Sequence, residues 1–219
     1  MSLSELWSLY GQNYIDALLA TWGMTLESFA IAMVLAVAVT VMRVSPLKPL
    51  RVFGDLYVQV FRNIPGIALL IIVVYALPPL KVVLPYRTCV IVATVLLGSA
   101  FGSENFMSGI NTVGVGQVEA ARSLGMSFSR ILAKIVIPQA LRSSVLPMTN
   151  LFIAVMLTTA LGSQVPLKPQ ALTGVVSYIN TRSLGGVAAF FISALGYLGT
   201  AFVVSHIGNY IDKKVRILR

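Results

Sequence analysis

Charged residues are scarce in this sequence of 219 residues, since Asp, Glu, Lys and Arg make up 11% of it and hydrophobic residues 57%. A soluble globular domain carries about a quarter charged residues. The composition therefore excludes an ordinary soluble domain and predicts an integral membrane protein. We expect a single all-α domain over residues 1–219, because its apolar runs have the length of membrane-spanning helices.

Residues that build disulfides and metal sites are almost absent. The one cysteine, Cys89, lies in an apolar run, which excludes a disulfide framework and predicts a small core residue. The one histidine, His206, has no neighbouring ligand types, so we expect an interfacial residue and no metal site. No GxxxxGK[ST] phosphate loop occurs, so we expect no ATPase activity and no cofactor on this chain. Residues 1–20 lack a basic start followed by an apolar core, so we expect no signal peptide.

Five apolar segments are long enough to cross the roughly 30 Å hydrocarbon core of a bilayer. An aromatic-rich segment, Leu3–Ala20, precedes them and is typical of a helix at the membrane interface. The expected spans are about Trp22–Met42, Phe53–Leu77, Thr88–Ile110, Ile135–Leu161 and Gly185–Val204.

Prolines and glycines interrupt these spans. Pro65 and Gly66 predict a kink in the second span, and Pro138 and Pro147 predict breaks in the fourth. A polar stretch at residues 162–184 has room for a short outer helix. Small residues in the third span, from Gly98 to Ser103, permit close helix packing.

Five spans put the two termini on opposite sides of the membrane, and the distribution of Lys and Arg selects the sides. With the C-terminus inside, eleven cationic residues face the cytoplasm and four face outwards. We therefore expect the N-terminus outside, and the net charge of +9 then suits anionic membrane lipid and needs no nucleic acid. The inner set is Arg43, Lys48 and Arg51 in a basic turn, Arg122, Arg130, Lys134, Arg142, Lys213, Lys214, Arg216 and Arg219; the outer set is Lys81, Arg87, Lys168 and Arg182.

The most distinctive stretch is the polar loop Gly116–Pro138, which lies between apolar spans. Gln117–Leu124 contains good helix formers and ends at Gly125, a common helix terminator. Ser127 is placed to cap a second helix that runs towards the bilayer. The loop therefore predicts a helix–Gly–helix unit whose short first helix lies across the cytoplasmic face.

The residues of this loop carry a family resemblance. Glu119-Ala120-Ala121, then Gly125, then Ile135-x-Ile137-Pro138 resembles the EAA signature of ABC importer permeases, with Ile137 in the usual place of Leu. The neighbouring Gly-Gln and Pro-Gln-Ala-Leu-Arg sequences resemble the polar amino acid branch, which includes histidine, glutamine and glutamate permeases. The resemblance implies a type I ABC importer permease fold in a bacterial cytoplasmic membrane, with residues 116–138 as the coupling segment.

The same resemblance implies partners. Two ATPase subunits would bind ATP and Mg²⁺ and receive the coupling helix, a homologous permease would form a homodimer or heterodimer, and an extracellular binding protein would deliver a polar amino acid. The residues that the resemblance assigns to ATPase coupling are Gln117, Glu119, Ala120, Ala121, Arg122 and Gly125.

A substrate path is indicated by charges at membrane depth, which are costly and usually face a cavity or a partner. Arg62 and Glu104 are such charges: Arg62 is suited to a carboxylate and Glu104 to an ammonium group. They fit equally well a structural ion pair, or an Arg62 that reaches the interface. Further polar candidates, which would otherwise join helices, are Asn63, Ser103, Asn105, Asn150, Thr158 and Thr159.

Departures from the family pattern bear on the substrate. Met107 stands where polar amino acid permeases often have Arg, and Thr158 stands where they often have Asp. The missing acid disfavours a basic amino acid, and the Met42–Pro46 sequence resembles glutamate-type permeases. A sister permease making most substrate contacts is one alternative. Another is an autonomous secondary transporter or channel for a small polar solute, with Arg62 and Glu104 in an ion pathway; a membrane-bound enzyme lacks a recognisable constellation.

Overall fold

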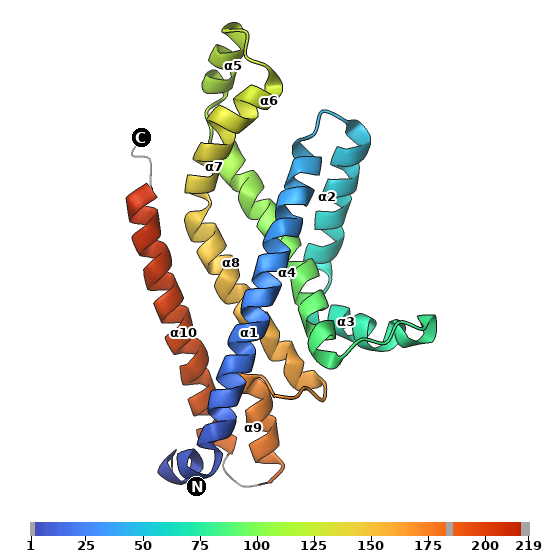
Figure 1. Ribbon diagram of the computed structural model, residues 1–219, viewed down its shortest axis with the longest axis vertical. Helices are drawn as coiled ribbons and strands as arrows, with labels where there is room; N and C mark the ends of the chain where they lie inside the picture. Colours follow the sequence, from blue (N-terminus) through green and yellow to red (C-terminus); the bar gives the residue numbers. More distant parts are fainter. Residues whose placement is uncertain (1–2, 183–185, 216–219) are drawn as a thin grey trace.

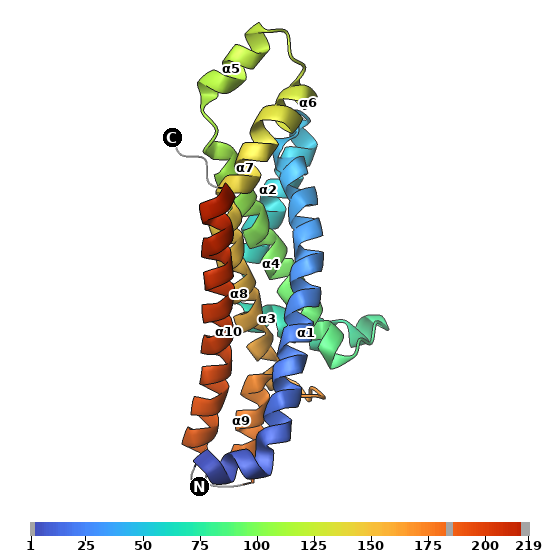
Figure 2. The same ribbon diagram turned by 60° about the vertical axis from the view of Figure 1, so that its left-hand side comes forward.

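The computed structural model describes residues 3–182 and 186–215, and the regular elements in these ranges are helices. Figures 1 and 2 show an elongated bundle with the N-terminal turns at one end and the helices α5 and α6 at the other. Within the described ranges four helices are long and apolar enough to cross a membrane, and one bent helix pair makes a fifth candidate. The all-α class is confirmed, and four to five candidate spans agree with the expectation of about five.

Helix α1, Leu3–Val44, is continuous over 42 residues and packs along α4, Tyr86–Asn111. The predicted junction between an interfacial helix and the first span therefore falls inside one helix, whose first turns lie across the long axis of the bundle (Figure 1). Gly102 explains the close approach of α1 and α4, because an added Cβ there would lie 2.8 Å from Met33 Cε and 2.9 Å from Ala36 Cβ. The predicted close packing at residues 98–103 is confirmed.

The second span is where the prediction needs correction. Helix α2 is Lys48–Asn63, so the basic turn predicted at residues 43–51 shrinks to a short connection between α1 and α2. After Pro65 the chain continues as α3, Gly66–Ile71, the π-helical turn η1, Ile72–Ala76, and the 3-10 turn η2, Pro78–Leu80. The two parts meet at 101°, so the predicted kink is a sharp corner, and α3 projects sideways from the bundle (Figure 1).

The remaining elements complete the bundle. At one end lie α5, Val115–Ser123, α6, Phe128–Ile131, and the π-helical turn η3, Leu132–Val136. The broken fourth span follows as α7, Ile137–Ser143, α8, Val145–Thr158, and the 3-10 turn η4, Thr159–Gln164, as the two prolines predict. The short helix expected after the fourth span is present as α9, Leu172–Asn180, and α10, Gly186–Val215, runs well past the predicted end at Val204. Gly185, Arg216 and Arg219, used in the sequence predictions, lie outside the described residues.

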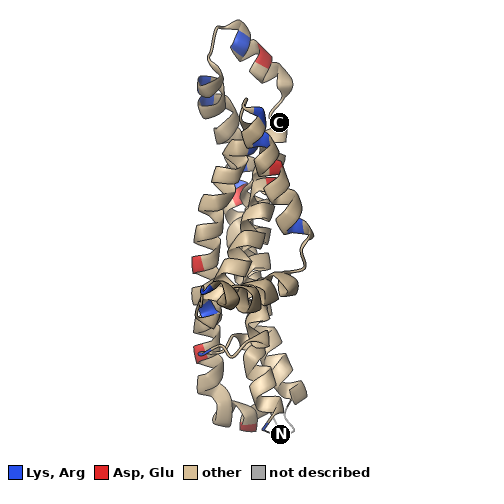
Figure 3. Cartoon of the chain, turned by 90° about the vertical axis from the view of Figure 1, so that its right-hand side faces the viewer, with Lys and Arg blue, Asp and Glu red and all other residues tan. Residues whose placement is uncertain are grey.

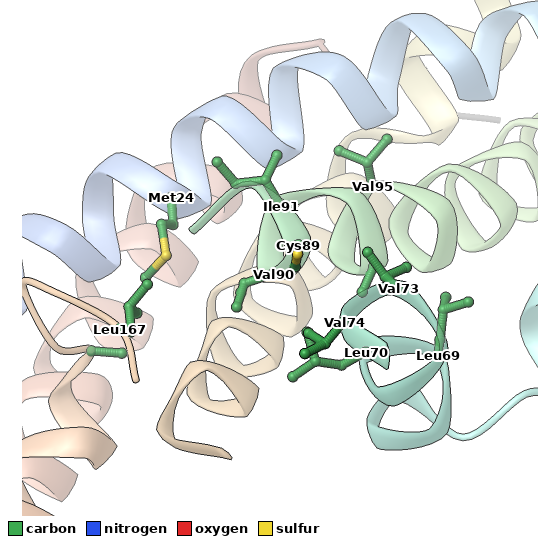
Figure 4. Packing of buried hydrophobic residues seen from close by; sticks show 12 residues of the cluster. Met24, Leu69, Leu70, Val73, Val74, Cys89, Val90, Ile91, Val95 and Leu167 are labelled. Atoms are coloured by element: carbon green, nitrogen blue, oxygen red, sulfur yellow. The ribbon is translucent and has the colours of Figure 1, made fainter. Parts of the chain in front are cut away.

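The largest apolar cluster sits where α3, η1 and α4 meet. In Figure 4 the side chains of Leu70 and Val74 point towards Cys89 and Val90 of α4, while Met24 of α1 lies beside Leu167. Cys89 is 2% exposed, so the prediction of a small core residue is confirmed. This cluster fixes the corner after α2 and thereby the position of Arg62 near its end.

Replacing Gly102 by Leu should destabilise the bundle. Overpacking a tight contact costs about 1–3 kcal/mol, and for a chain of this size each kcal/mol lowers the midpoint of thermal unfolding by about 2–4 °C. A Cβ added at Gly199 of α10 would meet open space, so Gly199→Leu is the matched control. We expect Gly102→Leu to melt several degrees lower in detergent and Gly199→Leu to melt like the wild type; equal melting of both variants would contradict the packing at Gly102.

Candidate coupling segment and transport cavity

Gly125 ends α5 in the way that its sequence predicts. Its φ is +75°, a conformation that costs other residues energy. The Gly125 N–H donates to the Arg122 carbonyl at 2.9 Å, and the Met126 N–H donates to the Ala121 carbonyl at 3.1 Å. These are the two hydrogen bonds of a Schellman motif. The predicted helix–Gly–helix unit is confirmed. Ser127 occupies the N-cap of α6, but within the described chain its side chain makes no capping hydrogen bond, so that part of the prediction is wrong.

The predicted coupling residues fall into two groups. Gln117, Glu119, Ala120, Arg122 and Gly125 are exposed at the tip of the molecule. Ala121, by contrast, is buried in the chain's own packing, together with Val113, Ile131 and Val136. The exposed surface of α5 thus carries one acid and one base around a small residue, next to Leu124, which is 82% exposed. A surface of this kind is suited to a close protein contact.

A side-chain hydrogen bond ties α5 to α7. Gln139 Nε2 donates to Gln117 Oε1 at 2.6 Å and also to the Ile135 carbonyl at 3.1 Å. These two glutamines flank the EAA pattern in the sequence. Their contact links the start of the exposed helix to the helix that leads back into the bundle.

Four charged side chains form a network between α1, α2 and α4. Arg43 donates to Asp55 at 2.8 Å and to both carboxylate oxygens of Glu104, at 3.2 and 3.4 Å. Glu104 Oε1 also lies 3.1 Å from Arg62 Nη1. Arg43 in addition donates to Ser103 Oγ at 3.2 Å. Of the sequence alternatives for Arg62 and Glu104, the geometry brings the two together as an ion pair, with Arg43 as an unforeseen third member.

Arg62 connects this network to a cavity of about 1090 Å³ between α2, α3, α4 and α8. The Arg62 guanidinium carbon lies 5.3 Å from the centre of the Phe101 ring, which also lines the cavity. Among the described residues that line it, Arg62 is the charged one. The wall is otherwise mostly apolar, with polar side chains at Thr94, Asn105, Asn150, Thr158, Ser163, Gln164 and Thr173.

The sequence-predicted path residues are therefore split by the structure. Arg62, Asn105, Asn150 and Thr158 line the cavity. Four others do not: Asn63 donates to the Gln59 carbonyl, Ser103 lies beside Thr40 and Arg43, Glu104 lies behind Arg62, and Thr159 donates to the Met156 carbonyl.

Sequence reasoning missed the most buried arginine of the network. The Arg43 side chain is 11% exposed, whereas the sequence indicated only a cytoplasmic basic turn at this position. Its carboxylate partner Asp55 was not singled out either. No local signal could have found Arg43, because its partners Ser103 and Glu104 lie 60 and 61 residues away in the sequence. In the structure Gly54 leaves room for it, since an added Cβ there would lie 2.8 Å from Arg43 Cγ.

In the cartoon of Figure 3 most Lys and Arg positions lie towards the end that carries α5 and α6, and few charged positions lie along the rest of the bundle. A cavity with polar groups inside membrane-length helices, joined to an exposed helix at one end, defines a subunit of a membrane transport system. The chain belongs to the family described as binding-protein-dependent transport system inner membrane component, whose profile matches residues 28–217. It is accordingly a multi-pass inner-membrane protein.

Two curated relatives align over nearly the whole chain. One is the glutamate transport system permease protein GluC of Corynebacterium efficiens, 33% identical over 90% of this chain and 91% of the relative. The other is the L-cystine transport system permease protein TcyB of Bacillus subtilis, 30% identical over 95% of this chain and 91% of the relative. The fold matches a solved amino acid ABC transporter with histidines, with a TM-score of 0.91, 24% identity, and coverage of 98% of this chain and 99% of that chain.

Replacing Gly125 by Val should loosen the coupling segment. A β-branched residue at positive φ costs about 1–2 kcal/mol, which corresponds to roughly a five- to thirtyfold larger open population. Gly116 has no atom near its Cβ position and lies in α5, so Gly116→Ala is the control. We expect trypsin to cut at Arg122 and Arg130 at least about fivefold faster in Gly125→Val, and no faster in Gly116→Ala. Equal cutting of all three proteins would refute the role of Gly125.

Proposed function

We propose that the chain is the transmembrane subunit of an ATP-driven importer that moves a polar amino acid, of the glutamate or glutamine type, across the cytoplasmic membrane. One combined observation carries this proposal. An exposed α5 with the EAA pattern lies at one end of the bundle, and the bundle contains a cavity in which Arg62 is the charged residue among the described lining residues. The chain acts as one transmembrane domain and does no ATP chemistry itself. Separate ATPase subunits bind ATP and Mg²⁺.

The cavity supports the substrate class. An arginine holds a carboxylate through paired hydrogen bonds, and each relative transports, by its name, an amino acid with at least one carboxylate. The uncharged Thr158 lies on the wall where a base-binding acid would be expected. The cavity volume of about 1090 Å³ is slightly larger than the usual range of ligand pockets, about 300–1,000 Å³. That size is suited to half of a path completed by a homologous permease, which receives cargo from an external binding protein.

We assign the ATPase contact to the exposed coupling residues on and directly after α5, while Ala121 supports the helix from the chain's own packing. ATP-driven closure of the ATPase dimer would displace this helix as a rigid body. Two contacts would transmit this displacement to η3 and α7: the hydrogen bond between Gln139 and Gln117, and the apolar packing of Ala121. Because α7 continues into α8, which lines the cavity, a movement of α5 reaches the substrate path.

Reversing the charge of Glu119 tests the coupling role. We expect Glu119→Lys to insert and fold normally, since the side chain is exposed, but to reduce ATP-driven amino acid uptake at least about tenfold, because one unfavourable buried charge contact costs several kcal/mol. The assay is uptake of radiolabelled glutamate, glutamine and cystine into proteoliposomes that contain the chain with its co-purified subunits and binding protein. Asp212→Lys, a charge reversal on α10 at the same end, is the control. Uptake driven by an ion gradient without any ATPase would support an autonomous transporter instead.

The orientation is proposed to be N-terminus outside and C-terminus inside, from the distribution of basic residues. Leu124 at the end of α5 is 82% exposed and Leu9 near the N-terminus is 66% exposed, so both positions can carry a reactive cysteine. The native Cys89 is 2% exposed, so we expect it to remain unlabelled. In intact cells a membrane-impermeant maleimide should label Leu9→Cys and spare Leu124→Cys. Inverted vesicles should give the reverse pattern, and labelling of Leu124→Cys from outside would contradict the orientation.

A further inference from the structure

The three central charges of the network are not equivalent. Arg43 holds Glu104 with both ends of its guanidinium fork, through Nη1 to Oε2 at 3.2 Å and Nη2 to Oε1 at 3.4 Å. Arg62 touches Glu104 through one nitrogen, 3.1 Å from Oε1. The Arg43 side chain is 11% exposed and that of Arg62 is 37% exposed. Glu104 is therefore bound firmly on the side away from the cavity and loosely on the cavity side.

We propose that Glu104 is an internal competitor for the substrate: it occupies Arg62 in the empty cavity, gives Arg62 up to a substrate carboxylate, and takes it back when the substrate leaves. The inference rests on the proposed function and deepens it, because it names the residues that set how tightly the cavity holds its cargo. Arg43 is a positioning residue in this exchange, since it keeps Glu104 paired in both states.

The energetic reason is the cost of an unpaired charge away from water. Removing one member of a buried ion pair leaves the other uncompensated, which is strongly unfavourable. If Glu104 had Arg62 alone, every binding event would strand a carboxylate. With Arg43 present, Glu104 keeps two hydrogen bonds after Arg62 turns to the substrate. The exchange therefore replaces one carboxylate by another on Arg62 and leaves no charge unpaired.

The surroundings hold both arginines in place during the exchange. Arg43 is held by hydrogen bonds to Asp55 at 2.8 Å and to Ser103 Oγ at 3.2 Å. Neither of these two partners lines the cavity. Arg62 rests on the face of Phe101, 5.3 Å from the ring centre. This contact does not involve Glu104, so Arg62 can keep it at the cavity wall when it releases Glu104. The Asp55 side chain is 52% exposed and screened by water, so the three inner charges, with one net positive charge between them, attract an anionic group.

The test measures equilibrium binding of radiolabelled glutamate, glutamine and cystine to the purified complex of this chain and its ATPase, without binding protein. Coupling free energies between two binding interactions in a protein typically correspond to about 5- to 150-fold in affinity. Removing the competitor by Glu104→Gln should tighten binding of the transported amino acid at least about fivefold. It should also slow turnover in proteoliposomes, because nothing recovers Arg62.

Arg43→Met should weaken binding by a similar factor, because Glu104 then depends on Arg62. The double variant Arg43→Met, Glu104→Gln separates positioning from simple structural support: it should bind as tightly as Glu104→Gln alone. The double variant has no carboxylate at residue 104, so it should fold even if the unpaired Glu104 prevents Arg43→Met from folding. Its binding can then still be measured. Glu27→Gln is the matched control, since Glu27 pairs at 2.6 Å with Arg87 between the same two helices, α1 and α4, away from the cavity.

The proposed exchange is overturned if Glu104→Gln binds the amino acid no more tightly than the wild type. It is also overturned if Arg43→Met weakens binding and the double variant shows the same loss of affinity. Either result, with a wild-type complex that transports, leaves the proposed function standing. A folded wild-type complex that neither binds nor transports any of the three amino acids would overturn the proposed function and this inference with it.

Discussion

The structure depends on one constraint: charges placed among membrane-spanning helices must be paired, because hydrocarbon offers them no water. Glu104 meets this constraint through two arginines, and the three residues come from three different helices. The pairing therefore fixes the mutual positions of α1, α2 and α4. It also leaves one arginine at the cavity wall, so the same contacts that hold the bundle together prepare a site for an anionic group.

The far end of the molecule meets a different need. Helix α5 is exposed on the side that carries Glu119 and Ala120, and its own chain holds it through the Ala121 cluster and the Gln117–Gln139 hydrogen bond. The π-helical turn η3 ends two residues before Pro138, as η1 ends two residues before Pro78. A proline ring clashes with the carbonyl four residues earlier in an α-helix, and a wider turn relieves the clash. The helix is therefore adjusted locally before each of these two prolines.

The sequence carried much of this architecture in its local chemistry. Apolar runs predicted the spans, Gly125 predicted the end of α5, and the charges Arg62 and Glu104 marked the network, because each signal comes from residues close together in the chain. The 101° corner after α2 was underestimated, since Pro65 predicts a break but the angle depends on how Leu70 and Val74 pack against α4. Arg43 was misplaced for the same reason: its burial depends on Glu104, 61 residues away, which no local pattern records.

The central claim is that this chain couples a membrane cavity to an ATPase through α5. The most direct measurement is to solubilise the protein from its native membrane in mild detergent, purify it, and identify by mass spectrometry what accompanies it. We expect an ATP-hydrolysing subunit to accompany the chain in stoichiometric amount. We also expect a bifunctional reagent to crosslink this subunit to the variant Leu124→Cys, because Leu124 is 82% exposed at the end of α5. A folded, monodisperse chain recovered without any ATPase would contradict the central claim.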